Sequence, residues 1–340
     1  MSNAAAVEQC YAAAVTKKRN HEEEVTMAKI TRLSIALGLF IVSCSIAEAR
    51  EADSSKSLPT APLHSFEGGS GVFLTNLAYL AKPPKEGEIF GPPSISQSTI
   101  FLDGIGRYVY AVTGNLFGNI ELGYSHELFD VDDWIDDIYH ITGLMASDKV
   151  KVHNFNIRAK LIEEGDFGFD WMPTVTFGTH FKWNEDISDI NRQLNGLCDT
   201  VGTDHSFGTE FTLMASKTVK DILPRPFIIS AGLRNGDSIH TGLLGFAGER
   251  RTTFEGSIVV FLTDRLMFAT EYRQSPDFVD DYNLGGKTLI KGERDWFDLA
   301  LAYVIDENLT IGIGYSSTDF GNNILEQDNS VWAFQVKYNF

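Results

Sequence analysis

The last ten residues, "VWAFQVKYNF" at 331–340, decide the fold class, because they alternate strictly between two kinds of side chain. One parity is apolar and aromatic and consists of Trp332, Phe334, Val336, Tyr338 and Phe340. The other carries the polar side chains Gln335, Lys337 and Asn339. A period of two residues predicts a β-strand with one apolar face. That face meets either a protein core or lipid, and alternation alone does not decide between them.

Composition and charge limit the classes of function. The chain has 340 residues, of which 43% are hydrophobic and 22% charged, as expected of a folded protein. Its formal net charge of -18 argues against a nucleic-acid partner, since such partners require basic side chains at the phosphates. Cys10, Cys44 and Cys198 form no CxxC pair and have no metal-ligand spacing.

Residues 27–49, "MAKITRLSIALGLFIVSCSIAEA", have the pattern of a cleaved signal peptide. Lys29 and Arg32 precede an apolar run at 33–46, and the small residues Ala47 and Ala49 mark the cleavage site. The apolar run of about 14 residues is shorter than the roughly 20 that a spanning helix requires. We therefore expect export and cleavage after Ala49.

Two alternatives remain open at this end of the chain. The sequence "IVSC" at 41–44 resembles a lipobox, in which Cys44 would be acylated. Residues 1–26 are unusual ahead of a signal peptide, and we interpret them as a non-native or misannotated extension with Met27 as the true start. The remaining chain is expected to hold a periplasmic segment at 50–70 and a barrel at 71–340.

From residue 71 onward the two-residue period predicts twelve strands. They are expected near 71–80, 105–114, 119–128, 151–162, 173–183, 204–216, 226–235, 252–262, 265–274, 295–304, 309–316 and 330–340. The region 95–112 is compatible with one long strand or two short ones. An even number of strands is typical of bacterial outer-membrane barrels.

Short and long connections alternate between these strands. The long ones are expected near 81–104, 129–150, 184–203, 236–251, 275–294 and 317–329. Short periplasmic turns and long extracellular loops are the rule in outer-membrane barrels, whereas a soluble barrel has no reason to sort its connections. Most apolar runs are roughly nine to eleven residues, the length of a tilted spanning strand. We therefore predict an all-β chain with one transmembrane antiparallel β-barrel of about twelve strands in a Gram-negative outer membrane.

Several blocks of the sequence also resemble a known family. They are "GNLFGNIELGYSHELFD" (114–130), "WMPTVTFGTHFKWN" (171–184), "TGLLGFAGE" (241–249), "FEGSIVVFLTDRLMFATEYRQSPD" (254–277) and "DWFDLALAYVIDENLTIGIGYSSTDFGN" (295–322). In order and spacing they are similar to the proteobacterial family of unknown function DUF3034. The resemblance implies an outer-membrane barrel and brings no activity or functional residues. The acidic stretch 130–146 and the loop around Gly285-Gly286 are read as local elaborations.

The side chains on the polar parity are the best functional candidates. The candidates for the lumen lining are Glu121, Arg158, Lys160, His180, Lys182, Glu210, Arg234, Glu255, Glu271, Arg273, Asp298 and Lys337. Acidic and basic side chains are balanced, which allows ion pairs across the lumen. Polar barrel interiors are typical of pores, so we expect a channel for passive diffusion of small polar solutes. The alternative is a closed barrel whose long loops serve adhesion or assembly.

The sequence offers little support for an enzyme. There is no GxSxG motif, and "GGSGVF" at 68–73 has no setting for a nucleophile. An outer-membrane lipid hydrolase is the less favoured alternative, and no cofactor is expected.

Partners are predicted at two places. Asp130, Asp132, Asp133, Asp136 and Asp137 gather in one expected extracellular loop. Divalent cations near lipopolysaccharide are one interpretation, although the glycine and the closing Glu of a calcium loop are missing and solvation is favoured. Phe334, Tyr338 and Phe340 resemble the terminal signal by which the barrel assembly machinery recognises its substrates, with outer-membrane lipid as the surrounding partner.

Overall fold

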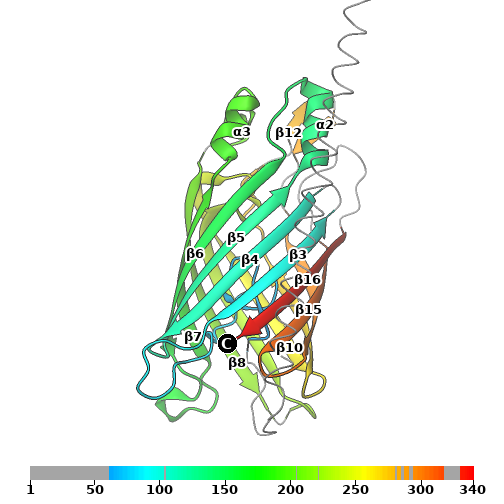
Figure 1. Ribbon diagram of the computed structural model, residues 1–340. Coiled ribbons are helices and arrows are strands. Elements are labelled where there is room, and N and C mark those ends of the chain that lie inside the picture. The colour runs from blue at the N-terminus through cyan, green and yellow to red at the C-terminus, as the bar shows by residue number, and fades with distance from the viewer. Residues whose placement is uncertain are drawn as a thin grey trace, which may run out of the picture. The chain divides into compact units, whose positions relative to one another are not determined.

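Twelve antiparallel strands form a closed barrel in the computed structural model, which describes residues 61–102, 105–203, 205–220, 222–279, 282–284, 287–290, 294–317 and 330–340 (Figure 1). In chain order the barrel strands are β3 (Ser94–Leu102), β4 (Ile105–Leu116), β5 (Ile120–Asp130), β6 (Lys149–Ile162), β7 (Thr174–Asn184), β8 (Phe207–Val219), β9 (Phe227–Ser238), β10 (Phe246–Phe261), β11 (Leu266–Arg273), β14 (Trp296–Val304), β15 (Leu309–Ser317) and β16 (Ser330–Asn339). The C-terminal strand β16 closes the barrel by pairing with β3, from Trp332 opposite Phe101 to Asn339 opposite Ser94. The predicted fold class is confirmed.

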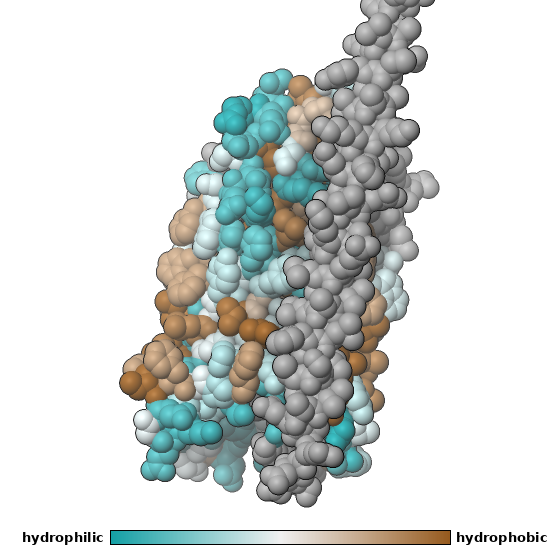
Figure 2. Space-filling view, in the orientation of Figure 1, coloured by the Kyte–Doolittle hydropathy of each residue, from teal (hydrophilic) through white to brown (hydrophobic). Residues whose placement is uncertain are grey.

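The outer face of the barrel is apolar along the predicted parity. In β14, Phe297, Leu299, Leu301 and Tyr303 are exposed, and the residues between them are buried. The same holds for other strands, with exposed Phe155, Ile157, Phe177, Phe211, Leu213, Ile229, Leu233, Phe254, Ile258, Ile311, Tyr315, Trp332 and Phe334. In Figure 2 this hydrophobic surface lies between hydrophilic surfaces at the two ends of the barrel. An apolar exterior is the arrangement of barrels that face lipid.

The connections divide between the two ends of the barrel. The end that holds the C-terminus carries the turns 117–119, 163–173, 262–265 and 305–308 and the described residues 222–226 between β8 and β9, and we call it the turn end (Figure 1). Its 163–173 turn includes the 3-10 helix η1 (Asp166–Gly168). The opposite, loop end carries α2 (Asp132–Thr142), α3 (Ile187–Gln193), α4 (Leu197–Thr200), the 3-10 helix η2 (His240–Gly242) and the hairpin β12 (Tyr282–Leu284) and β13 (Lys287–Ile290).

The start of the barrel differs from the sequence-based expectation. The expected strand at 71–80 is not part of the barrel, which begins at Ser94 with β3, and the expected long loop at 81–104 contains that strand. Residues 95–112 therefore form parts of two strands. Residues 61–81, assigned partly to a periplasmic segment and partly to the barrel wall, lie buried inside the barrel instead. A buried segment is as rich in apolar residues as a barrel strand, which explains the error.

Some predictions lie outside the described residues. These are the signal peptide at 27–49 with Ala47 and Ala49, the start at Met27, the alternative at Cys44, and the Gly285-Gly286 loop. Within the part of the chain that the structure describes, no helix is long and apolar enough to cross a membrane.

Candidate functional site

Residues 61–81 fill the inside of the barrel, and we call this segment the plug. Nearly all of its side chains are buried, including Leu63, His64, Phe73 and Leu77, which have no exposed surface. The barrel wall binds the plug as far as its first residue, since Lys337 near the end of β16 donates to the carbonyl of Ala61 at 3.0 Å. The lumen therefore contains protein where a simple pore contains water.

The plug has a fold of its own. The short strands β1 (Leu63–His64) and β2 (Ser70–Gly71) pair as an antiparallel hairpin. Gly68, in the connection between them, has a φ of 83°, a conformation that glycine adopts without strain. Its neighbours are close, because a Cβ on Gly68 would lie 3.0 Å from backbone and side-chain atoms of Ser125. The plug is thus a compact hairpin seated directly on the barrel wall.

One side of the lumen is apolar over most of its surface, and we call it the apolar wall, although the strands that form it also carry buried Glu255, Glu271, Arg273, Asp298 and Lys337. Its inward side chains come mainly from β10, β11, β14 and β16 and include Val259, Phe261, Met267, Ala269, Trp296, Ala300, Ala302, Val304, Val331 and Ala333. The plug packs Leu63, Phe66, Phe73, Leu74 and Leu77 into the same buried cluster. Burial of apolar side chains on both partners stabilises the inserted plug.

The opposite side of the lumen, the polar wall, consists of β5 to β9 and binds the plug with charged and polar groups. Arg158 of β6 donates to the plug carbonyls of Ser70, at 3.1 Å, and Leu77, and it pairs with Glu121 at 2.7 Å. Glu121 in turn accepts from the backbone N–H groups of Ser70, at 3.1 Å, and Ala81, at 2.6 Å. Buried carboxylates that accept backbone N–H groups satisfy both partners.

A second carboxylate binds the tip of the plug. Glu271 of β11 accepts from three successive backbone N–H groups, those of Phe73, Leu74 and Thr75, at 2.7–3.1 Å, and from the Thr75 hydroxyl at 2.8 Å. Its neighbour across the strand pair is Asp298 of β14. Consecutive N–H groups that converge on one carboxylate form an anion-binding nest. Here the bound anion is the Glu271 carboxylate of the barrel wall.

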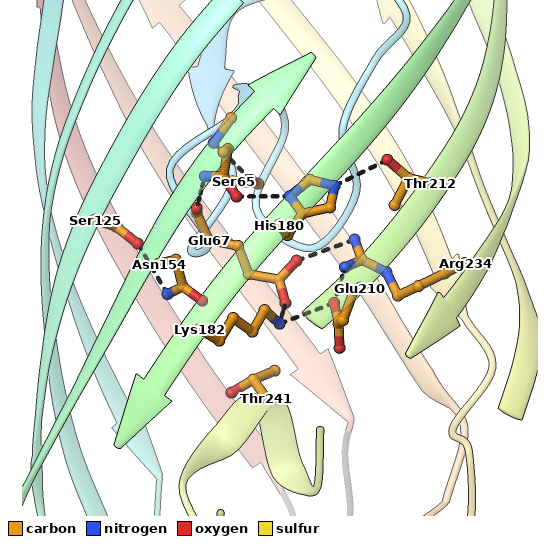
Figure 3. Close-up of polar contacts among 12 residues, drawn as sticks. Ser65, Glu67, Ser125, Asn154, His180, Lys182, Glu210, Thr212, Arg234 and Thr241 are labelled. Atoms are coloured by element: carbon orange, nitrogen blue, oxygen red, sulfur yellow. Dashed lines mark hydrogen bonds and ion pairs between the residues drawn. The ribbon is translucent and has the colours of Figure 1, made fainter. Parts of the chain in front are cut away.

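Glu67 of the plug lies among three basic side chains of the wall, of which Figure 3 shows Lys182 and Arg234. It pairs with Lys182 of β7, with Arg234 of β9 at 3.0 Å and with Arg273 of β11 at 3.1 Å. We call these three residues the basic clamp. The carboxylate has a side-chain exposure of 2%, so its charge is compensated by the clamp rather than by water.

Two wall carboxylates complete this cluster. Glu210 of β8 pairs with Lys182 at 2.9 Å and with Arg234, and Glu255 of β10 pairs with Arg234 at 2.9 Å. His180 lies beside them and hydrogen bonds with Asn156 at 2.6 Å and Thr212 at 2.8 Å. With Glu67 in place, three acidic groups face three basic ones.

The loop end of the barrel carries a cap. Trp134, Ile135 and Ile138 of α2 and Ile187 and Ile190 of α3 form a buried cluster with Ile239, Leu243 and Leu244 next to η2. Asn184 holds this inturned segment by donating to the carbonyls of Gly242, at 2.8 Å, and Leu243, at 2.9 Å. His240 and Thr241 have positive φ values of 46° and 63°, so the segment is bent sharply inward.

A small recess, which encloses about 20 Å³, lies next to the basic clamp. Its lining is Glu210, Arg234, Gly236, Ser238, Thr241, Arg251, Thr253, Arg273, Gln274, Ser275, Pro276 and Trp296. Two members of the clamp, Arg234 and Arg273, therefore face both the recess and Glu67.

At the turn end, Tyr79 connects the plug to two turns. Its hydroxyl donates to Glu164 at 2.5 Å and contacts the Thr218 hydroxyl at 2.6 Å. Burial raises the pKa of Tyr79, and the hydrogen bond to Glu164 adds to this. Burial also raises the pKa of Glu164, but hydrogen bonds from Tyr79, Lys217 and the Thr218 backbone outweigh it and leave that pKa below its ordinary value.

The structure places most of the lumen candidates together. Eleven are buried inside the barrel, namely Glu121, Arg158, His180, Lys182, Glu210, Arg234, Glu255, Glu271, Arg273, Asp298 and Lys337. Lys160 is the exception, because it lies near the turn end, is partly exposed and pairs with Glu163 at 3.2 Å. A bulge in the pairing of β6 with β7, between Lys160 and Ile162, lies at this position.

Sequence reasoning missed Glu67 and Arg107. Arg107 of β4 pairs with Glu127 and lies over the rings of Phe66 and Phe129. The available signal for the plug was the close spacing of Gly68, Gly69 and Gly71 next to buried-type residues, which indicates close backbone approach.

The expected acidic loop is a helix. Asp132 and Asp133 form the first turn of α2, where acidic side chains favour helix formation, and Asp130 pairs with Lys149 at 2.5 Å. No three His, Cys, Asp or Glu side chains within the described ranges cluster as metal ligands would. Lipopolysaccharide and cation binding at these residues stays a prediction.

A Ser–His contact does occur in the lumen, between His64 and Ser96 at 2.9 Å. The second ring nitrogen of His64 contacts Thr113 at 2.9 Å, and the imidazole has no exposed surface. A hydrolase requires that substrate reach the nucleophile, so this pair is interpreted as an anchor of the plug.

The fold and its interior define a class of protein: a twelve-stranded barrel with an apolar exterior, plugged by a segment that precedes its first strand. The chain belongs to the family described as "Protein of unknown function (DUF3034)", whose model matches residues 60–336. The resemblance found in the sequence is thus confirmed. No curated protein matches the chain.

Among solved structures, the chain is similar in fold to the KdgM porin, with 10% identity, a TM-score of 0.43 and coverage of 73% of this chain and 99% of the porin. It is also similar to the outer membrane protein Omp33 of Acinetobacter baumannii, with 8% identity, a TM-score of 0.42 and coverage of 74% and 99%. The NanC porin aligns with 11% identity, a TM-score of 0.41 and coverage of 73% and 98%.

Proposed function

We propose that this protein is an outer-membrane channel for small polar solutes that its own plug holds closed in this conformation. The observation that carries the proposal is that buried charged side chains of the barrel wall line the lumen and bind the plug. The polar wall is lined with charged side chains whose partners include plug atoms, such as Arg158 with the carbonyls of Ser70 and Leu77. When the plug leaves, these groups require water or solute in its place.

The location in the outer membrane rests on three features. The exterior is apolar, the helices and the longer connections lie at one end of the barrel, and β16 closes the barrel on β3 with aromatic side chains on its outward face. A cleaved signal peptide at 27–49 supplies the export that this location requires. Fractionation of cells on a density gradient tests the location, and recovery with the inner membrane contradicts it.

Opening requires that the plug move, because it occupies the lumen between Ala61 and Ala81. Twelve strands enclose a bore between that of a filled eight-stranded barrel and that of an open porin. A barrel without the plug therefore has room for a narrow aqueous path along the polar wall. Because an open lumen exposes the apolar wall to water, the displaced plug is expected to return to the lumen.

The test compares the full chain with a variant that lacks residues 61–81, both in planar lipid bilayers. We expect rare openings for the full chain and steady conductance for the deletion variant. Heat-modifiable migration on a gel confirms that each barrel is folded. A folded deletion variant that passes no ions contradicts the channel.

The second candidate function is a closed barrel that serves as a scaffold. The cap at the loop end favours it, because α2, α3 and the segment around η2 share one buried cluster and present a structured outer surface. This candidate predicts that neither the full chain nor the deletion variant conducts.

A further inference from the structure

The side chains of the basic clamp can bind carboxylates other than that of Glu67 in the plug. Lys182, Arg234 and Arg273 come from three different strands and converge on one carboxylate, that of Glu67. Arginine and lysine that converge on a carboxylate bind it through short, charge-assisted hydrogen bonds. The clamp is therefore a carboxylate-binding site of the barrel wall, whichever carboxylate occupies it.

The charges of the cluster balance only while the plug is in place. Without Glu67, the three basic groups of the clamp face two acidic ones, Glu210 and Glu255, which leaves one positive charge in excess. An uncompensated buried charge is unfavourable, so the clamp is destabilised without Glu67. An anion that takes the place of Glu67 restores the balance.

The recess gives such an anion an approach to the clamp. Arg234 and Arg273 lie at its boundary, and Arg251 adds a third guanidinium group. Hydroxyl groups of Thr241 and Thr253 are also part of the lining. The space enclosed in the recess is about 20 Å³, enough for a water molecule, so an incoming carboxylate takes the position that the Glu67 carboxylate vacates.

We propose that the basic clamp is a binding subsite for small organic acids, and that the Glu67 carboxylate of the plug occupies it as a stand-in for the carboxylate of the solute. A carboxylate that reaches the clamp through the recess competes with Glu67 for Arg234 and Arg273. Displacement of Glu67 weakens the hold on the connection between β1 and β2 of the plug, so binding of the solute favours opening. This inference rests on the proposed function in its second half, the link to opening, and on the clamp alone in its first half.

The binding half is tested with the full chain in detergent micelles by calorimetric titration with succinate. Glu67→Gln removes the competing charge and retains the shape of the side chain. We expect it to bind succinate more tightly than the wild type by roughly tenfold or more, the effect of one lost charge-assisted competitor. The double variant Glu67→Gln/Arg273→Gln is expected to lose that gain.

Two controls separate the clamp from general electrostatics. Glu163→Gln removes the same charge from an exposed residue that pairs with Lys160 near the turn end, and it is expected to bind succinate as the wild type does. Dimethyl succinate has the same carbon skeleton without charge, and no variant is expected to bind it. Equal succinate affinity for the wild type and Glu67→Gln, or a gain that persists in the double variant, overturns the proposal.

A second measurement covers the case in which Glu67→Gln does not fold. Ser65 of the plug is buried, and Ser65→Cys, in a chain whose native cysteines are replaced by serine, is expected to react with a thiol reagent several-fold faster in succinate than in chloride at equal ionic strength. An unchanged rate overturns the link to opening. Binding by Glu67→Gln without conductance of the plug-deletion variant leaves the subsite standing and contradicts the channel.

Discussion

The ring of Phe73 lies directly over Gly314 of β15, and a Cβ on that glycine would come within 2.9 Å of the ring. Gly312, two residues earlier on the same strand, leaves room for Leu63 in the same way, since a Cβ on Gly312 would lie 2.8 Å from that side chain. The wall therefore lacks side chains where the plug has its large apolar ones. The fit indicates that the plug and the wall form a single packed interior.

Gly314→Val is expected to loosen the plug without breaking the barrel. The added side chain competes with Phe73 for the same space, and overpacking of this kind costs about 1–3 kcal/mol. Because 1.4 kcal/mol is a factor of ten in an equilibrium, openings in planar bilayers should become roughly tenfold more frequent.

The matched control for that variant is Gly114→Val in β4. A Cβ at Gly114 meets nothing within 4 Å, so the same substitution in the same kind of strand should leave the frequency of openings unchanged. Equal behaviour of the two variants would show that the effect does not come from Phe73.

A disulfide between the plug and the wall should hold the barrel closed. The backbone N–H of Ala78 donates to the Ser216 hydroxyl at 2.7 Å, so Ala78→Cys and Ser216→Cys bring two thiols within bonding reach. We expect openings to disappear under oxidising conditions and to return with a reductant. Openings that continue after complete oxidation would mean that the plug does not close the lumen.

Acidification should release the plug at the turn end. The pKa of Glu164 is lowered in the folded state, so its stabilising contribution is present above the pKa of the unfolded chain and is lost as the pH falls through the lowered pKa. Protonation weakens its contacts with Tyr79 and Lys217, and openings should become more frequent.

Glu164→Gln separates this effect from the other carboxylates. The variant should show the higher frequency of openings already at neutral pH and a weaker rise on acidification than the wild type. A pH response identical to that of the wild type would remove Glu164 from the explanation.

Deletion of Phe340 should impair assembly and leave export intact. Phe340 is exposed, its ring packs edge-on against Tyr338 with centroids 4.9 Å apart, and its N–H donates to Pro93 just before β3. Loss of these contacts at the seam, together with the expected insertion signal, should lower the amount of heat-modifiable barrel in the membrane fraction. A normal amount of folded barrel would contradict both roles.

Much of the wall was predictable from local sequence. The strict alternation of 331–340 and of β14 predicted which side chains face outward, because successive side chains of a strand point to opposite faces. The same alternation predicted that Arg158, Lys182, Glu210 and Arg234 face inward. The prediction that Lys160 lines the lumen was wrong because its strand bulges near the turn, and a two-residue period does not reveal a bulge.

The plug was not predictable in the same way. Glu67 meets Lys182, Arg234 and Arg273, which lie more than a hundred residues away, and no local pattern encodes such a meeting. The apolar residues of 71–80 fit a barrel strand as well as a buried segment. The correct total of twelve strands concealed the error, since β3 took the place of the expected first strand.

The sequence by itself thus determined the terminal strand, the barrel and the two faces of its wall, because a period of two residues is a local property of the chain. The tertiary structure alone decided that "VWAFQVKYNF" closes the barrel on β3 and that its inward Gln335 and Lys337 bind His64 and Ala61 of the plug. The physical reason is that a buried polar group accepts any partner of the right chemistry, and only the closed barrel brings that partner within hydrogen-bond distance.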